Sequence, residues 1–296
     1  MNIVGAGLAG LMAAHAFPNA RLWEAAPEPT AAHHALLRFR SDAVSRLTGV
    51  EFTPVAVHKG IFWRGQYRAP DIRLANLYSR KVLAGALLDR SIWDLAPVTR
   101  WVAPMDLYER LLDAVRNRVS WATPWDFTTP GPVLSTAPLP VVLGCFGMEP
   151  RHTFKHESIR VLRYRLPDAH VHQTVYFPEL AHTMYRASIT GNVLIVEFAG
   201  SEDDGQGWEA ELANAFALPE CIEIMDEVDQ KYGQIAPIDE TARKRIIATL
   251  TTDHGIYSVG RFATWRNILL DDVVQDLAIV KRLLVASDYD RAMAAL

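Results

Sequence analysis

The chain has 296 residues, of which 50% are hydrophobic and 22% charged, a composition typical of a folded globular enzyme rather than of a disordered or fibrous chain. The formal net charge of −4 indicates no broad basic face, so charge does not suggest DNA as a partner, although a local basic groove would be compatible with it. The two cysteines, Cys145 and Cys221, lie far apart without the spacing of metal ligands, so we expect neither a disulfide scaffold nor a metal site. The first strand is expected to start at residue 2, and the apolar run Ile3–Phe17 is too short to span a bilayer, which favours a cytoplasmic protein that does not enter the membrane.

The first 24 residues have the pattern of a dinucleotide site. A short apolar strand runs into Gly5-x-Gly7-x-x-Gly10, an Ala/Leu/Met-rich helix follows, and a second short strand ends on Glu24. Gly5 permits a tight turn, Gly7 lets the backbone approach a pyrophosphate, and Gly10 lets helix and strand pack closely. Glu24 can accept hydrogen bonds from a ribose, and this full context disfavours the alternative of a simple glycine-rich turn. The residues expected to contact the dinucleotide here are Gly5, Ala6, Gly7, Leu8, Ala9, Gly10 and Glu24.

After a loop, residues 35–49 are predicted to form one helix that is ended by a glycine. Arg38 and Arg40, near its start, are candidates for the phosphates of a bound nucleotide, and we include Arg40 among the cofactor-binding residues. Solvated arginines on a helix surface are the alternative for both. Residues 50–70 alternate apolar and polar side chains and therefore predict strands, which carry His58 and Lys59 as either surface residues or catalytic candidates.

The middle of the chain shows one clear helix. Asp71–Trp101 has no regular pattern, and Pro104 then opens an amphipathic helix. A short strand is expected at Val119–Thr123, where the backbone of Val119 could contact an adenine ring. Another strand is expected to end at Ser135-Thr136-Ala137-Pro138. The apolar face of the helix is predicted to hold Met105, Tyr108, Leu111, Leu112 and Val115.

The second half of the chain begins with a run of strands and ends with a strand and a helix. From Ser158 to Gly200 four strands are separated by hairpin-like turns, which predicts an antiparallel sheet inserted into the nucleotide domain. Helices are expected around residues 208–218 and 239–254, with a strand or helix between them. A strand at Ile256–Arg261 and a closing helix from about Leu269 to Ala286 follow, and the start of such a helix can face a cofactor ring.

Three separated motifs together resemble the glutathione-reductase-type FAD superfamily, and most closely its UDP-galactopyranose mutase and amine-oxidase branch. They are GAGLAG with Glu24, the strand VLSTAP at residues 133–138, and GRFATWRN at residues 260–267. Weaker matches are VHKGIFW around His58 and the segment HQTVYFPELAHTMYRAS, which resembles a strand pair of the mutases. The matches cover most of the chain in the right order, and only the first motif is specific alone.

The resemblance implies an α/β fold in which a Rossmann-like FAD-binding domain carries an inserted antiparallel-sheet substrate domain. FAD would lie across the first domain, with its isoalloxazine near Gly260 and the following helix. Arg261 would contact the flavin or a substrate phosphate, and Arg186 would point from the inserted sheet toward the same cleft. The implied organisation is 1–57, 104–150 and 233–296 for the FAD-binding domain, 58–103 for a substrate-side insertion and 151–232 for the antiparallel-sheet domain.

Two departures from the mutases weigh against a UDP-sugar substrate. The chain is shorter, and the missing length falls around Asp71 to Pro104, where the mutases carry a helical domain with a mobile substrate loop. Asn267 also stands where they place a tyrosine that binds the sugar-nucleotide diphosphate. The resemblance therefore favours an FAD-dependent oxidoreductase that acts on an amine or amino-acid-like substrate by hydride transfer to flavin.

Such a site needs aromatic side chains and an arginine for a carboxylate, which Trp63, Tyr176, Tyr185, Arg186 and Trp265 could supply. Core packing is the alternative for each aromatic residue, and a salt bridge on the sheet is the alternative for Arg186. The substrate is expected to be a small molecule or a nucleotide-linked one. The catalytic candidates are His58, Lys59, Tyr185, Arg186, Trp265 and Asn267.

Three other functions stay open from the sequence. One is a non-redox flavin enzyme of the mutase type. Another is a flavin-dependent lyase that trims an amino-acid-modified thymine in viral DNA, for which a basic run could track phosphates unless it is a solvated face. The last is a structural FAD or an NAD domain, although plain nicotinamide domains do not need the late Gly260 motif. The basic run consists of Arg151, His152, Lys155, Arg160, Arg163 and Arg165.

Overall fold

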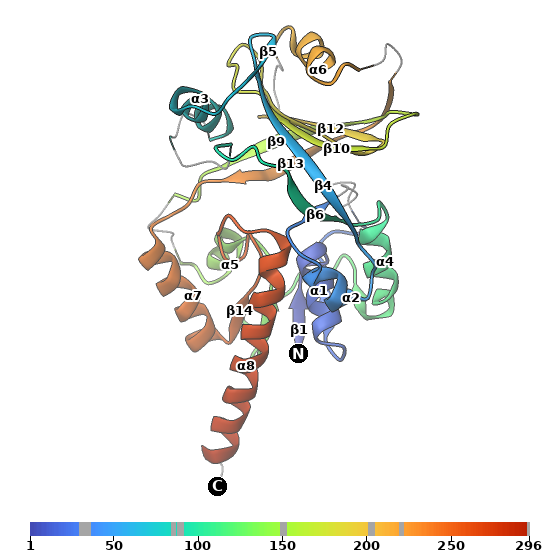
Figure 1. The fold of residues 1–296 in the computed structure, drawn as a ribbon. Helices are drawn as coiled ribbons and strands as arrows, with labels where there is room; N and C mark the ends of the chain where they lie inside the picture. Colours follow the sequence, from blue (N-terminus) through green and yellow to red (C-terminus); the bar gives the residue numbers. More distant parts are fainter. Residues whose placement is uncertain are drawn as a thin grey trace. The chain divides into compact units, whose positions relative to one another are not determined.

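The computed structural model of the chain describes residues 1–29, 37–83, 87, 92–148, 153–200, 205–218 and 222–294. They form two compact units (Figure 1). Unit 1 comprises Met1–Thr53, Ala103–Phe154 and Pro237–Leu296, and unit 2 comprises Pro54–Val102 and Lys155–Ala236. The expected fold class is confirmed, because unit 1 contains a Rossmann-like parallel sheet and unit 2 a mainly antiparallel one.

The sheet of unit 1 consists of parallel strands in the order β14-β8-β1-β2-β7. In that order they are Ile256–Ser258, Val133–Ser135, Asn2–Val4, Arg21–Trp23 and Val119–Ser120. The strand order reverses at β1, which pairs with β8 on one side and with β2 on the other. In open parallel sheets, ligands bind at the carboxyl ends of the strands beside such a reversal. The residues at the middle of β1, β2 and β8 are fully buried, as expected for a sheet covered on both faces.

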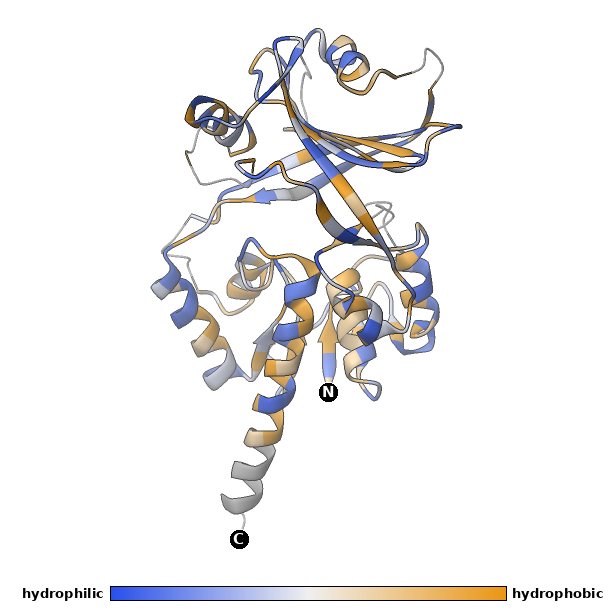
Figure 2. Cartoon of the chain, viewed as in Figure 1, coloured by the Kyte–Doolittle hydropathy of each residue, from blue (hydrophilic) through white to orange (hydrophobic). Residues whose placement is uncertain are grey.

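Helices of unit 1 surround this sheet. They are α1 (Leu8–Ala16), α2 (Ala43–Thr48), α4 (Leu107–Asp113), the 3-10 helix η2 (Arg116–Arg118), α5 (Leu139–Cys145), α7 (Glu240–His254) and α8 (Leu270–Ala294), with a short strand β3 at Arg38–Phe39. Helix α8 packs against α1 and α2, and Figure 2 shows hydrophilic and hydrophobic colours alternating along it, as in a helix with one packed face. Among the described residues, no helix combines the length and the apolar character needed to cross a membrane.

Arg118 closes the far end of α1. Its guanidinium donates to the carbonyl oxygens of Ala14, Phe17, Pro18 and Ala20 at 2.8–3.2 Å. These include carbonyls that the last turn of a helix leaves without partners, and a cation there also complements the helix dipole. The opposite end of α1, which follows the glycine turn, carries partial positive charge and therefore suits an anion rather than a cation.

In unit 2 the strand order is β13-β9-β12-β11-β10-β4-β6, with β5 paired to β4. The four strands β9, β12, β11 and β10 are antiparallel neighbours, as predicted. The segment left open as a strand or a helix is strand β13, which pairs antiparallel with β9. Strand β4 pairs with β10 in parallel, so the sheet is mixed there. One hydrophobic cluster includes residues of α6 and another includes residues of α3. The elements are β4 (Thr53–Trp63), β5 (Gln66–Arg68), α3 (Ile72–Val82), β6 (Val98–Val102), β9 (His156–Arg165), β10 (Val171–Tyr176), β11 (Met184–Gly191), β12 (Val193–Ala199), α6 (Trp208–Phe216) and β13 (Glu223–Ile235).

The single helix predicted over residues 35–49 is wrong in its first part. Strand β3 takes the place of its early turns, and only α2 is helical, while residues 35–36 lie outside the described part of the chain. A tertiary contact explains the difference. The Asp271 carboxylate accepts hydrogen bonds from the backbone N–H groups of Arg40 and Ser41 and from the Ser41 hydroxyl at 2.7–3.1 Å. These N–H groups are therefore bound by a residue more than 200 positions away, which local pattern cannot indicate.

Two helices were not predicted. Helix α3 lies in the stretch Asp71–Trp101 that showed no regular pattern, and the Asp71 side chain caps it by accepting the Leu74 N–H at 2.7 Å. Helix α5 begins directly after the predicted strand end at Pro138, with a proline in its first turn. Both are short helices whose apolar faces pack in the interior of their own unit, with buried residues Leu74, Ala75, Tyr78 and Val82 in α3 and Leu139, Val142 and Leu143 in α5.

Several element boundaries also differ from the prediction, among them the end of α8, which continues to Ala294 instead of ending at Ala286. The strand predicted over Ile256–Arg261 ends at Ser258, because Gly260 turns the chain with φ of +92°. The strand predicted over Val119–Thr123 ends after two residues. Helix α4 starts after Met105, which is 40% exposed rather than buried, whereas the other four residues of its predicted apolar face are buried.

Candidate functional site

Unit 1 contains a cavity of about 690 Å³ at the carboxyl ends of its parallel strands. Residues that directly follow β1, β2 and β8 form part of its wall. The wall continues along Pro124, Trp125 and Phe127, and then along residues 260–262, residues 268–270 and Val273. Segments from both ends of the chain therefore line one cavity at the strand reversal, which is the expected position of a ligand in this type of sheet.

The glycines of the first turn are required by close approaches. Gly5 has φ of +98°, and a Cβ atom on it would lie 2.3 Å from Thr136 Oγ1. A Cβ atom on Gly10 would lie only 1.8 Å from the Gly5 carbonyl oxygen. These contacts agree with the predicted reasons for a tight turn at Gly5 and for close packing at Gly10.

The N-terminus of α1 faces the cavity with main-chain groups. Gly7 is the N-cap residue and supplies no side-chain hydrogen bond, and the first turn of α1 contains no acidic residue. Gly7, Leu8 and Ala9 all line the cavity. The first N–H groups of a helix lack partners inside it and carry partial positive charge, so this end of α1 fits a pyrophosphate.

Glu24 follows β2, and it lines the same cavity. Its Oε2 accepts the Ala6 N–H at 2.7 Å, and its Oε1 accepts the Ala26 N–H at 2.9 Å. Because each carboxylate oxygen has two lone pairs, both oxygens can still accept a hydrogen bond from a ligand hydroxyl group. The predicted contact with a ribose is compatible with this geometry and stays a prediction.

Tyr108 supports the glycine turn, although the sequence indicated it only as a core residue. Its hydroxyl group, on α4, donates to the Ala6 carbonyl oxygen at 3.0 Å, and the residue is 2% exposed. Burial, together with the carboxylates of Glu24 and Glu109, raises the pKa of the Tyr108 phenol to about 12. The phenol is therefore protonated at neutral pH and able to donate this hydrogen bond.

Aromatic residues form the part of the wall beside Glu24. The rings of Trp23 and Trp125 have centroids 5.2 Å apart at an interplanar angle of 52°. Phe127, two residues after Trp125, is buried. Trp23 Nε1 donates to Asn2 Oδ1 at 2.9 Å, which fixes the orientation of its ring. Flat apolar rings beside a carboxylate suit a ligand that has an aromatic base next to a sugar.

The late Gly-Arg motif approaches the first helix directly. Gly260 has φ of +92°, and a Cβ atom on it would lie 3.1 Å from Ala9 Cβ. Arg261 and Phe262 line the cavity, and the Phe262 carbonyl oxygen accepts the Leu139 N–H at 2.9 Å. The two motifs that are most remote in sequence therefore lie on one cavity wall.

Six of the predicted residues in unit 1 are not among those that line this cavity, namely Ala6 and Gly10 of the glycine turn together with Arg40, Val119, Trp265 and Asn267. Arg40 forms an ion pair with Asp272 in the first turn of α8. Val119 lies in β7 opposite Leu22. Trp265 is 1% exposed and has an edge contact with Phe154, and Asn267 is exposed. Their cofactor or catalytic roles stay predictions without support from the cavity.

The remaining catalytic candidates belong to unit 2, where one carboxylate holds two of them. The Tyr185 hydroxyl donates to Glu197 Oε1 at 3.1 Å, and Arg186 forms an ion pair with the same Glu197. Burial, followed by the Glu197 charge, raises the pKa of Tyr185 well above its usual value, so Tyr185 is not a base near neutral pH. His58 and Lys59 lie on β4, where His58 is exposed and the Lys59 ammonium donates to a backbone carbonyl.

Both other aromatic candidates of unit 2 contact neighbouring side chains. The guanidinium groups of Arg64 and Arg73 lie 4.5 and 5.1 Å from the Trp63 ring centroid. Tyr176 packs edge-on against Tyr78, with ring centroids 5.4 Å apart, beside the hydrophobic cluster that includes α3. These contacts are those expected of the core-packing alternative.

Comparison with known proteins identifies the fold. No protein-family model matches the sequence, and no curated protein matches it. The structure of reduced UDP-galactopyranose mutase is similar, with a TM-score of 0.67 at 14% identity over 96% of this chain and 93% of that one. A CLA-producing fatty acid isomerase from P. acnes gives a TM-score of 0.59 at 11% identity over 95% and 97% of the two chains. A protein from Photorhabdus luminescens subsp. laumondii, described as an FAD-containing monooxygenase, gives 0.50 at 11% identity over 99% and 93%.

These similarities extend over nearly the whole chain, so both units take part in the shared fold. With identities of 14% or less they establish the fold and leave substrate and reaction to be proposed. The fold expected from the three sequence motifs is confirmed, whereas membership of the glutathione-reductase-type superfamily and of one of its branches stays a prediction.

Proposed function

We propose that this chain is an FAD-dependent oxidoreductase that removes a hydride from an amine or amino-acid-like substrate. The observation that carries the proposal is the cavity of unit 1, whose wall combines the glycine turn, Glu24 and the Gly260–Arg261 pair. Similarity in fold to an enzyme described as FAD-containing supports the same cofactor. A plain nicotinamide domain does not need the late glycine motif, which disfavours NAD.

Each part of the wall has a proposed task. The N–H groups at the start of α1 would bind the pyrophosphate, Glu24 the ribose, and Trp23 with Trp125 the adenine. Gly260 and Arg261 would contact the flavin end, beside the apolar side chains of Ile268, Leu270 and Val273 that line the cavity. FAD, when bound, supplies the group that accepts the hydride, and the protein supplies binding, orientation and electrostatics.

The substrate class rests on the sequence resemblance. Arg261 lies on the cavity wall, and the Arg186 side chain is 40% exposed although it is paired with Glu197. We propose Arg261 for an acidic group of the substrate, since a guanidinium binds a carboxylate or phosphate through two parallel hydrogen bonds. Arg186, in unit 2, stays a separate candidate for such a group.

A non-redox flavin enzyme of the mutase type is the second candidate, because the solved structure with a TM-score of 0.67 is that of a mutase. One assay separates the two candidates. In anaerobic solution an amine or amino-acid substrate should bleach the visible absorption of the oxidised flavin if the enzyme is an oxidoreductase. A mutase would leave the flavin oxidised and would convert substrate, without net oxidation, only after prior reduction by dithionite. A panel of amines, amino acids and UDP-sugars that produces neither result would contradict both.

The DNA-lyase alternative has less support. In the described part of its basic run, Arg160 and Arg163 form ion pairs with Glu227 and Asp226 on the neighbouring strand β13. Arg151 and His152 lie outside the described residues. Paired charges release fewer counterions from DNA than free ones, so we expect little retention on a DNA column at moderate salt. Strong salt-sensitive retention would restore this alternative.

A further inference from the structure

Gly260 and Arg261 lie on a turn next to the cavity, and hydrogen bonds from Thr264 stabilise this turn. Thr264 donates to the Gly260 carbonyl oxygen twice, from its N–H at 3.0 Å and from its hydroxyl at 2.7 Å. Thr264 is 4% exposed, and Trp265 beside it has φ of +47°, which is unusual for a bulky residue. The turn therefore depends on tertiary contacts to keep its shape.

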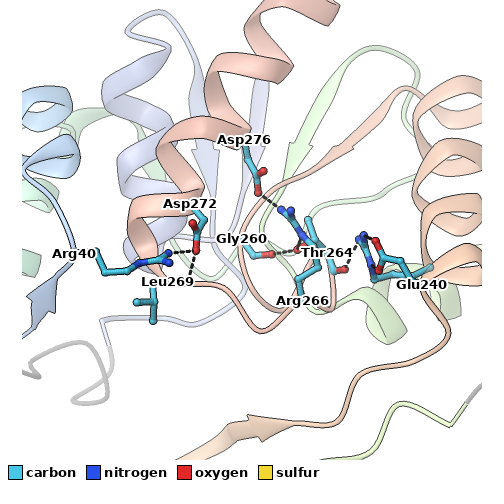
Figure 3. A network of polar contacts seen from close by, with 9 residues as sticks. Arg40, Glu240, Gly260, Thr264, Arg266, Leu269, Asp272 and Asp276 are labelled. Atoms are coloured by element: carbon cyan, nitrogen blue, oxygen red, sulfur yellow. Dashed lines mark hydrogen bonds and ion pairs between the residues drawn. The ribbon is translucent and has the colours of Figure 1, made fainter. Parts of the chain in front are cut away.

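Two arginines donate hydrogen bonds to Thr264, Arg243 from α7 and Arg266 from the loop before α8. Figure 3 shows Thr264 between Gly260 and Arg266. Arg243 of α7 donates to the Thr264 carbonyl oxygen at 3.1 Å and forms an ion pair with Glu240. Arg266 donates through Nε to the Thr264 hydroxyl oxygen at 3.2 Å and forms an ion pair with Asp276 of α8. Both the carbonyl and the hydroxyl group of Thr264 are thus fixed by charged side chains.

The members of this network lie behind the cavity wall rather than in it. Gly260 and Arg261 line the cavity, whereas Thr264, Arg266 and Asp276 are not among its lining residues. Burial raises the pKa of the Asp276 carboxyl, and the Arg266 charge opposes this shift. Any effect of the network on a ligand must therefore pass through the position of the turn.

We propose that the network of Thr264, Arg266 and Asp276 positions the Gly260–Arg261 pair for the flavin end of the cofactor. This inference rests on the proposed function. Among the described residues, no hydrogen bond or ion pair joins Thr264, Arg266 or Asp276 to Glu24 or to the first turn of α1. We therefore expect the network to influence the flavin end more than the adenosine diphosphate end. FAD and ADP are thus two probes that test different parts of one cavity.

The test measures the dissociation constants of FAD and of ADP by calorimetry for a matched pair of variants. Thr264→Val keeps the shape of the side chain but removes the hydroxyl that donates to Gly260 and accepts from Arg266. We expect FAD binding to weaken about tenfold or more, as for loss of a buried hydrogen bond, while ADP binding changes less than about twofold. Thr264→Ser keeps the hydroxyl and should restore FAD binding. Thr252→Val makes the same change at an exposed position of α7 and serves as control.

The outcomes are distinguishable. Wild-type protein that binds ADP but no FAD would overturn the proposed function and the inference with it. Wild-type protein that binds FAD, with Thr264→Val equal to it, would overturn the inference alone, and so would equal weakening of FAD and ADP. If circular dichroism shows that Thr264→Val does not fold, Asp276→Asn, which removes the charge opposite Arg266, takes its place with the same two ligands and the same criteria.

Discussion

Single atoms decide what the glycine turn tolerates. At Gly10 a Cβ atom would meet the Gly5 carbonyl oxygen at 1.8 Å, whereas at Gly144, on α5, a Cβ atom would meet nothing within 4 Å. We predict that Gly10→Ala lowers the free energy of unfolding by more than about 2 kcal/mol, because a rigid backbone atom must move. Gly144→Ala should be neutral or stabilising by up to about 1 kcal/mol. Urea unfolding measures both, and equal stabilities of the two variants would contradict the packing described here.

Tyr108 offers a second test at this turn. Tyr108→Phe removes the hydroxyl that donates to the Ala6 carbonyl oxygen and leaves the buried ring in place. We predict a loss of about 1–2 kcal/mol in the free energy of unfolding and weaker binding of FAD. Leu111→Ile, on the same helix, changes only core shape and is the control. If Tyr108→Phe binds FAD as wild type does, Tyr108 has a purely structural role.

Lys81, in the last turn of α3, gives a prediction for pH. Its ammonium donates to the Phe177 carbonyl oxygen at 3.1 Å, and burial lowers its pKa from 10.5 to about 7, although Glu211 and Glu179 oppose the shift. Between these two pKa values the unfolded chain binds more protons than the folded one, so this group makes stability rise with pH there. Below about pH 7 the cost of charging the buried lysine is fully present and no longer changes with pH. His182, whose Nδ1 lies 3.4 Å from Lys81 Nζ and whose Nε2 is hydrogen-bonded to Glu211 at 2.8 Å, belongs to the same cluster.

The measurement compares unfolding free energies of wild type and Lys81→Met at several pH values from 7 to 9. Relative to the variant, wild type should gain up to about 1.4 kcal/mol per pH unit. Lys244→Met, which removes an exposed lysine on α7, should show no such trend. A wild-type advantage that stays constant over this range would mean that Lys81 remains charged when folded.

At the scale of the residue, the sequence predicted those site residues that belong to one local motif. The first glycines and Glu24 were identified because turn, helix and acid follow one another within 24 residues. Tyr108 could not be identified as a site residue, because its partner Ala6 is 102 positions away and a buried tyrosine on an amphipathic helix usually indicates core. Arg40 was assigned to the nucleotide, and its ion pair with Asp272 depends on a contact between distant segments.

Among the elements, helix α3 has a local start signal, the capping residue Asp71, although its sequence shows no regular apolar pattern. Its N-cap Asp71 accepts the Leu74 N–H, whereas Asp106, the N-cap of α4, makes no side-chain cap hydrogen bond. We predict that Asp71→Ala costs about 1 kcal/mol of unfolding free energy and that Asp106→Ala costs clearly less. Thermal unfolding of the two variants checks this difference. A larger effect at Asp106 would contradict the assignment of the α3 cap.

The strands of unit 2 were predictable because β-branched and aromatic residues alternate with turn residues at hairpin spacing. Their partners were only partly predictable. The parallel pairing of β4 with β10 joins segments more than 100 residues apart, and nothing in either segment specifies that direction. The basic residues of β9 likewise have partners that the sequence does not indicate. Arg160 and Arg163 form ion pairs with Glu227 and Asp226 of the neighbouring strand β13.

For the whole molecule, the order of the motifs along the chain predicted which segments line the cavity, which the length of single elements does not indicate. The first and last segments of the chain were expected to meet at one ligand, and in unit 1 the residues after β1 and β14 line the same cavity. The strand order, with β1 between β2 and β8, explains why, since every strand directs its carboxyl end to one edge of the sheet. Substrate and reaction depend on side chains whose arrangement the fold alone does not specify.

Titration of the purified chain with FAD, followed by visible absorption and calorimetry, tests the central claim most directly. The account predicts one FAD per chain with flavin absorption bands. It also predicts that Gly7→Val and Gly260→Val each weaken binding at least about tenfold, because both glycines line the one cavity. A colourless protein that takes up no added FAD would contradict the account, and so would FAD binding that neither glycine substitution affects.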